Sequence, residues 1–189
     1  MRKVEILEKI YLNPGIHLRE IARRTKLGIP AVKNHLDSLL KEKIVIKKME
    51  GRNLKFFINF ENKSIIPYLY EIETFRLKKL PRKVENAIMD LLFLLENKPI
   101  ITIIFGSYAK GNYTKESDLD ILLIFNQIDK EEIEEKSKII GSRYSLRINC
   151  VYLPWKEFRK KFFDSSDVFM QEIKKNKIIV NGIEYWVAL

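Results

Sequence analysis

The chain has 189 residues, of which 46% are hydrophobic and 32% are charged, with a single cysteine and a formal net charge of +10. This composition indicates a globular protein of one or two domains and excludes a disulfide framework. No apolar run is long enough for a transmembrane helix, and acidic residues in the amphipathic N-terminus argue against a signal peptide. We therefore expect a cytoplasmic protein without a membrane partner.

The positive charge is concentrated in the first part of the chain. Residues 1–80 contain 18 Lys and Arg against 9 Asp and Glu, whereas residues 81–189 contain 17 against 16. This asymmetry indicates a polyanionic partner for the N-terminal part alone.

The N-terminal pattern predicts three helices followed by a β-hairpin. Apolar residues recur at helical spacing in the first 40 residues, and two alternating strands follow, separated by a Gly-containing turn. The phrase HLREIARRTKLGIPAVKNHLDSLLKEKIV closely resembles the winged helix-turn-helix of archaeal and bacterial transcription factors. The resemblance implies that residues 1–62 form a domain that binds double-stranded DNA. The predicted elements are helices at 4–12, 18–26 and 30–43, and strands at 44–48 and 54–60.

On this resemblance, the recognition helix begins at Ile29 or Pro30 and reads base edges with its first turns. An Asn suits an adenine edge, and Lys or Arg on the hairpin suits phosphates. An alternative is that the domain packs against a neighbour and its basic residues are a solvated face. The candidate DNA contacts are Lys33, Asn34 and His35 on the helix, and Lys47, Lys48 and Arg52 on the hairpin.

A connecting helix is predicted for residues 63–80, with Ile65, Leu69, Ile72 and Phe75 on one apolar stripe. Such a stripe must pack on another surface, and we favour its copy in a homodimer. Pro81 marks the expected boundary, because the residue before a proline avoids the helical conformation. The second domain is therefore predicted to cover residues 81–189.

The stretch ITIIFGSYAKGNYTKESDLDILLIF, residues 101–125, predicts a buried strand, a tight turn and a second strand. Gly106 permits the turn, and Ser107 stands where a helix would begin, a position suited to an anion. Asp118 and Asp120 project from one face of the second strand, about 7 Å apart. Carboxylates at that separation suit Mg²⁺ or Mn²⁺. The stretch therefore predicts a site for a nucleoside triphosphate and a metal ion.

The order Gly106-Ser107, ten residues, then Asp118-x-Asp120 resembles the signature of polymerase-β-type nucleotidyltransferases, above all the minimal nucleotidyltransferases of archaea and bacteria. The resemblance implies an α+β protein whose C-terminal domain is a mixed β-sheet flanked by helices. It also implies that Gly106 and Ser107 hold the triphosphate, that Asp118 and Asp120 bind metal, and that a third acid completes the site. Lys110 and Lys115 could add positive charge, although we favour the interpretation that both are surface lysines.

The third acid is expected on a later strand, and residues 146–153 (LRINCVYL) place Asn149 at that position. An Asn oxygen can ligate a metal, but it carries no charge and cannot accept a proton. If the strand register is wrong, another acid such as Glu157 completes the site. Cys150 on this strand is expected to be buried. Helices are predicted at 129–142, 154–163 and 166–175, and a closing hairpin at 177–187 around an Asn181-Gly182 turn.

Three functions fit these patterns. The first is a DNA-associated nucleotidyltransferase that binds Mg²⁺·NTP and transfers a nucleotidyl group to a protein or other acceptor. The second is a transcriptional regulator whose catalytically weakened second domain senses a nucleotide. The third, by resemblance to toxin–antitoxin minimal nucleotidyltransferases, is an antitoxin that nucleotidylates a partner toxin.

Overall fold

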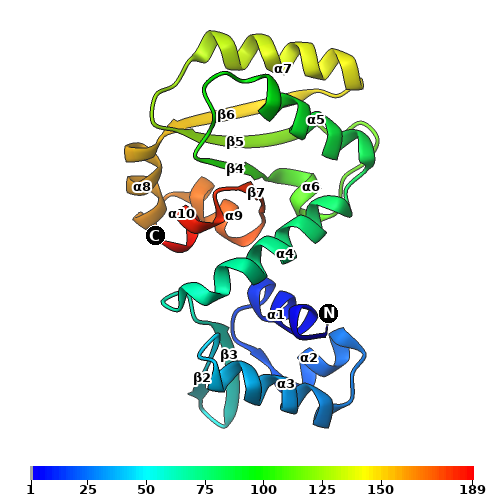
Figure 1. The fold of residues 1–189 in the computed structure, drawn as a ribbon, viewed down its shortest axis with the longest axis vertical. Helices are drawn as coiled ribbons and strands as arrows, with labels where there is room; N and C mark the ends of the chain where they lie inside the picture. Colours follow the sequence, from blue (N-terminus) through cyan, green and yellow to red (C-terminus); the bar gives the residue numbers. More distant parts are fainter. Residues whose placement is uncertain (1) are drawn as a thin grey trace. The chain divides into compact units, whose positions relative to one another are not determined.

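The computed structural model describes residues 2–189 and divides into two compact units, one up to Ile72 and one from Glu73 to Val187 (Figure 1). Each unit has its own sheet. Among residues 2–189, every helix is too short or too polar to cross a membrane.

The first unit contains the predicted three helices and hairpin. A third, very short strand joins the hairpin, because Ile16 pairs with Phe56, and the sheet order is β1-β3-β2. The helices bury Ile6, Leu7 and Leu39 against this sheet's inner residues. The elements are α1 (Arg2–Leu12), β1 (Ile16–His17), α2 (Leu18–Thr25), α3 (Ile29–Lys41), β2 (Val45–Glu50) and β3 (Asn53–Ile58).

The predicted connecting helix is a 3₁₀ turn, Lys63–Ile65, followed by α4, Ile66–Lys78. Three members of its predicted apolar stripe are buried, Ile65, Leu69 and Ile72. The fourth, Phe75, is 56% exposed and so does not belong to the buried face.

The second unit is a four-stranded mixed sheet in the order β6-β5-β4-β7. Strand β4 pairs antiparallel with β5 and β7, whereas β5 and β6 run parallel. Helices α5 and α7 cover one face of this sheet, where Ile88 and Ile140 join the core with Ile121 and Leu123 (Figure 1). The elements are α5 (Arg82–Leu94), β4 (Ile101–Ile104), α6 (Gly106–Lys110), β5 (Leu119–Phe125), α7 (Lys130–Tyr144), β6 (Ile148–Pro154), α8 (Trp155–Phe163), α9 (Val168–Lys175), β7 (Ile178–Asn181) and α10 (Ile183–Val187).

The predicted closing hairpin at 177–187 is wrong. Strand β7 is present but pairs with β4, and the segment after Gly182 is the helix α10 instead of a second strand. Gly182 has a φ of +81°, and a Cβ there would lie 2.2 Å from the carbonyl oxygen of Ile100. The glycine therefore serves a turn into a helix, which buries Trp186 and Val187.

A half-buried lysine, Lys177, directly precedes β7. Arg76 donates to the carbonyl oxygen of Lys177 at 2.6 Å and to the carboxylate of Glu73 at 2.9 Å. Lys177 Nζ donates to the carbonyl oxygen of Lys174 and lies 4.8 Å from the centre of the Trp186 ring. Burial lowers the pKa of Lys177 to about 8, an effect that the negative charge of Glu73 opposes.

This lowered pKa predicts a pH-dependent stability. In the unfolded chain Lys177 keeps its proton up to about its ordinary pKa of 10.5, whereas the folded protein releases it near 8. Between these values the unfolded state binds more protons, so the free energy of unfolding should rise with pH, by up to about 3 kcal/mol. Urea unfolding at pH 7.5 and 9.5 measures this, with Lys177→Met as the non-titrating control. The same pH dependence in both proteins would contradict the prediction.

Candidate functional site

Asp118, Asp120 and Asn149 lie together at one end of the β5–β6 pair. Asn149 Nδ2 donates to Asp118 Oδ2 at 3.3 Å and to Asp120 Oδ1 at 3.1 Å. The parallel register places Asp120 opposite Asn149, so the alternation of the strand brings these polar side chains to one face. Glu157 belongs to α8, which starts beyond the far end of β6, and the structure does not bring it to this cluster.

The turn between β4 and α6 is packed directly against this cluster. Gly106 has a φ of +66°, and a Cβ on it would lie 2.2 Å from Asp120 Oδ2. The backbone N–H of Phe105 donates to the carbonyl oxygen of Asp120 at 3.0 Å. Only glycine fits here, both for its backbone conformation and for the space that a carboxylate already fills. Ser107, the second residue of α6, follows this turn directly.

Two cationic side chains near the cluster, Lys110 and Arg147, have different carboxylate partners. Lys110 Nζ lies 2.7 Å from Glu172 Oε1, and its hydrogen bond lowers the pKa of the Glu172 carboxyl. Arg147 instead lies beside the acid pair, with Nη1 3.6 Å from Asp118 Oδ2. The alternation of side chains along a strand predicts this face for Arg147, because it precedes Asn149 by two positions.

The carboxylate oxygens of the cluster are the kind of ligand that a hard divalent cation takes. Among residues 2–189, no three Asp, Glu, His or Cys side chains are grouped to hold a metal ion. Asp118 and Asp120 offer carboxylate oxygens, which suit Mg²⁺. Asn149 presents its amide nitrogen to both carboxylates, so its oxygen becomes a ligand only if the amide turns.

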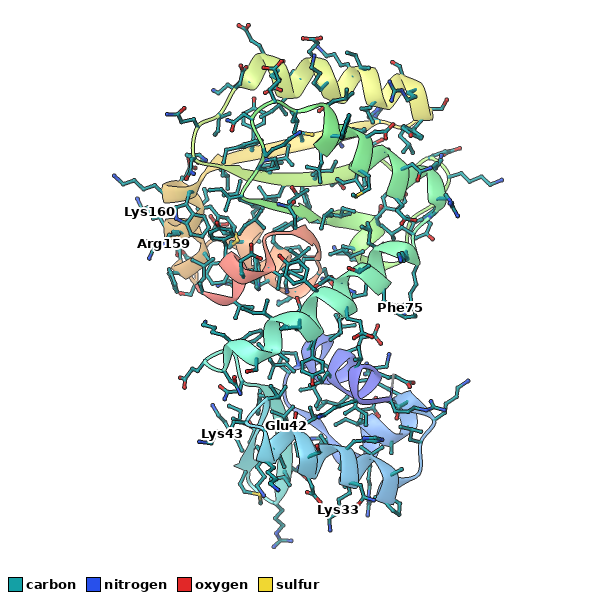
Figure 2. All side chains as sticks on the ribbon, viewed as in Figure 1. Lys33, Glu42, Lys43, Phe75, Arg159 and Lys160 are labelled. Atoms are coloured by element: carbon teal, nitrogen blue, oxygen red, sulfur yellow. The ribbon has the colours of Figure 1, made fainter. Side chains whose placement is uncertain are left out.

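The predicted DNA contacts lie on two elements of the first unit. Helix α3 carries the side chain of Lys33 on its outer surface (Figure 2). On the hairpin, Lys48 Nζ lies 5.6 Å from the centre of the Phe57 ring, a cation–π distance. Exposed are Lys33, Asn34, Lys47, Lys48 and Arg52, whereas His35 is half-buried.

Comparison with known families gives two matches. Residues 2–46 match a winged helix-turn-helix DNA-binding family, and residues 91–180 match the nucleotidyltransferase domain family. Two curated relatives from Methanocaldococcus jannaschii are both named "Putative protein adenylyltransferase". One is 35% identical over 89 residues, covering 44% of this chain and 88% of the relative. The other is 37% identical over 59 residues, covering 31% of this chain and 58% of the relative.

A solved structure described as a toxin-antitoxin with AMP-PNP is also similar. It shares 22% sequence identity and a TM-score of 0.40, covering 55% of this chain and 77% of that chain. The fold, the matched families and the first relative define an α+β nucleotidyltransferase-type protein with an N-terminal DNA-binding domain. The chain belongs to the nucleotidyltransferase domain family, joined here to a winged helix-turn-helix.

The packing of Gly106 predicts a selective effect on ligand binding. In Gly106→Ala the added methyl group must displace the Asp120 carboxylate. We therefore expect this variant to lose any rise in melting temperature that Mg²⁺·ATP produces in the unaltered protein. The matched control is Gly111→Ala, since Gly111 also has a left-handed φ, +76°, but open space around it. An equal thermal response to Mg²⁺·ATP in both variants would contradict the role given to Gly106.

Proposed function

We propose that this protein transfers a nucleotidyl group from Mg²⁺·NTP, with ATP the preferred donor, to a protein acceptor, and that its winged helix associates it with double-stranded DNA. The observation that carries the proposal is the convergence of Asp118, Asp120 and Asn149 against the Gly106 turn. The names of the two curated relatives support a protein acceptor and an adenylyl donor.

In this proposal one group of residues binds the phosphates and another binds the cation. Gly106 and Ser107 would hold the β- and γ-phosphates through backbone N–H groups and the hydroxyl at the start of α6. Asp118 and Asp120 would hold a divalent cation, which neutralises charge on the phosphate oxygens when bound. Lys110 would reach the triphosphate only by leaving Glu172.

The proposed transfer is a substitution at the α-phosphorus. A hydroxyl oxygen of the acceptor forms a bond to this phosphorus, the bond to the bridging oxygen breaks, and pyrophosphate leaves with the electron pair. The hydroxyl proton must pass to water or to a carboxylate. Asn149 cannot take it, because an amide is not a base. We therefore propose normal nucleotide binding combined with slow transfer.

Labelled NTPs test the proposal. The full-length protein is incubated with each α-labelled NTP, Mg²⁺ or Mn²⁺, and host lysate, and a labelled macromolecule is sought. The Asp118→Asn/Asp120→Asn double variant keeps the volume of both side chains and removes both charges. Label transferred equally by both proteins, or no thermal response to any Mg²⁺·NTP or Mn²⁺·NTP, would count against the site.

A carboxylate at position 149 should accelerate transfer. In Asn149→Asp the new side chain can accept the proton of the attacking hydroxyl, and such help is worth about 10²–10⁴-fold. Asn149→Ala is the control, since it removes the amide without supplying a base. The rate of Asn149→Asp should also gain a dependence on pH that wild type lacks. If wild type already transfers at an ordinary enzyme rate and Asn149→Asp changes nothing, Asn149 is not limiting.

The exposed Lys and Arg side chains of the first unit predict that the protein binds DNA. The full chain should bind duplex DNA with an affinity that falls steeply with salt, because Lys and Arg displace counterions. Lys47→Ala/Lys48→Ala should weaken binding to all sequences and flatten the salt slope. Asn34→Ala should change sequence preference by about 1–3 kcal/mol. Lys83→Ala/Lys130→Ala, in the second unit, serves as the charge-matched control in gel shifts at several salt concentrations.

Two outcomes of these experiments separate the remaining alternatives. A thermal response to Mg²⁺·NTP that changes DNA affinity without any labelled acceptor would favour a nucleotide-sensing regulator. A labelled acceptor that is a small toxin encoded beside this protein would favour an antitoxin.

A further inference from the structure

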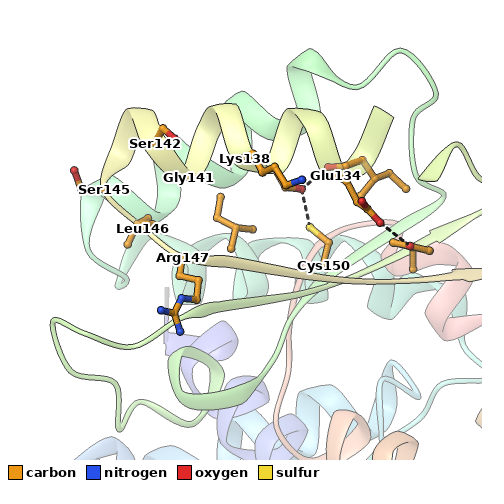
Figure 3. Close-up of a pocket in the computed structure, with 12 residues that line it drawn as sticks. Glu134, Lys138, Gly141, Ser142, Ser145, Leu146, Arg147 and Cys150 are labelled. Carbon is orange, nitrogen blue, oxygen red and sulfur yellow. Dashed lines mark hydrogen bonds between the residues drawn. The ribbon is translucent and has the colours of Figure 1, made fainter. Parts of the chain in front are cut away.

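A groove runs between α7 and β6, the strand at the edge of the second unit's sheet (Figure 3). Its volume is about 630 Å³. The exposed flank of α7 forms the rim with residues four apart, and the floor is largely apolar. The rim residues are Glu134, Lys138 and Ser142, and the floor residues are Ile133, Leu146, Ile148 and Cys150.

The groove is continuous with the candidate site. Ser145, Leu146 and Arg147 line its end and also line a smaller cavity of about 200 Å³ that reaches Asp118. Arg147 spans the junction, because its guanidinium lies 3.6 Å from the Asp118 carboxylate. A molecule seated in the groove would therefore approach the acid pair from the side of β6.

The outer edge of β6 has no partner strand among residues 2–189. The carbonyl oxygen of Arg147 accepts from the N–H of Leu119 at 2.8 Å and so faces β5. Because backbone directions alternate, the N–H and C=O groups of Ile148, Cys150 and Tyr152 face the opposite way, toward the open edge. Such an edge is a template for an added strand.

The alternation of side chains along β6 then determines which residues of an added strand face the acid pair and which face the groove. The side chains of Ile148 and Cys150 line the groove, whereas that of Asn149 lies with the acid pair on the other face. A strand paired to this edge has the same alternation, so its residues next to Asn149 on that face point toward the site. Their two neighbours in the chain point into the apolar groove.

We propose that the α7–β6 groove is the acceptor site, where an extended segment of the acceptor protein adds a strand to β6 and presents a hydroxyl side chain to Asp118 and Asp120. The inference rests on the proposed function, since it names how the same site would take its acceptor. The segment has a hydroxyl residue flanked on both sides by apolar residues. The groove supplies the affinity, and the alternation of the strand selects which side chain reaches the acid pair.

A designed peptide tests the groove without requiring turnover. The probe has valine at every second position, threonine between the valines, a central tyrosine, and lysine at both ends for solubility. When it binds the full-length ¹⁵N-labelled protein, hydrogen exchange of the Ile148, Cys150 and Tyr152 amides should slow at least tenfold. The amides of Asn149 and Val151 face β5 and should change little.

Two matched tryptophan substitutions complete the test. Ser142→Trp places an indole over the groove and should weaken peptide binding at least tenfold. Ser165→Trp makes the same change at an exposed position between α8 and α9 and should leave peptide binding unchanged. Unchanged exchange at the three amides with millimolar peptide, or equal binding by both variants, would overturn the proposal.

The thermal response to Mg²⁺·ATP, measured on the same proteins, separates this inference from the proposed function. Both tryptophan variants should keep that response, because neither residue lies in the nucleotide site. If the peptide pairs with β6 but Mg²⁺·ATP does not change the melting temperature, the groove is supported as a peptide site and the proposed nucleotidyl transfer is not. A normal Mg²⁺·ATP response without peptide pairing would leave the nucleotide site intact and refute the groove.

Discussion

The contact between Gly106 and the Asp120 carboxylate is the constraint on which the candidate site depends. It joins the β4–α6 turn to strand β5 with no room for a methyl group between them. The hydrogen bond from Phe105 N–H to the Asp120 carbonyl fixes the same two segments from the backbone side. The β4–α6 turn, which suits a phosphate, and the start of β5, which suits a metal ion, are therefore in direct contact. No long side chain is needed to position them.

Strand parity accounts for what the sequence predicted of this site. Asp118 and Asp120 could be assigned to one face because side chains alternate along a strand, a rule that needs no tertiary information. Asn149 followed from the position of the third acid in the resembling family, and the observed pairing of Asp120 with Asn149 brings it to that face. The helices of both units were predicted because their apolar residues recur at a helical spacing.

Features that depend on distant partners could not be predicted in the same way. Strand β1 has two residues and exists because β3 offers it a partner, so it leaves no periodic pattern. The Asn181-Gly182 pair fits a hairpin turn by local rules, but close approach to the Ile100 carbonyl and burial of Trp186 favour a helix. Lys110 pairs with Glu172, and the groove arises from the packing of α7 on β6; both are contacts between separate elements.

The neutral Asn149 bridges the carboxylates of Asp118 and Asp120 through its amide N–H groups, which a third carboxylate could not do. Asp118 and Asp120 are like charges held close together, and each receives a hydrogen bond from the same amide. The amide N–H groups of Asn149 attract both carboxylates, whereas a third negative charge at this position would repel them. The amide of Asn149 thus holds the two carboxylates in one arrangement. Under the proposed function, the amide that bridges the two carboxylates is also a side chain that cannot accept a proton. Asn149 would therefore support the geometry of the site and limit the rate of transfer.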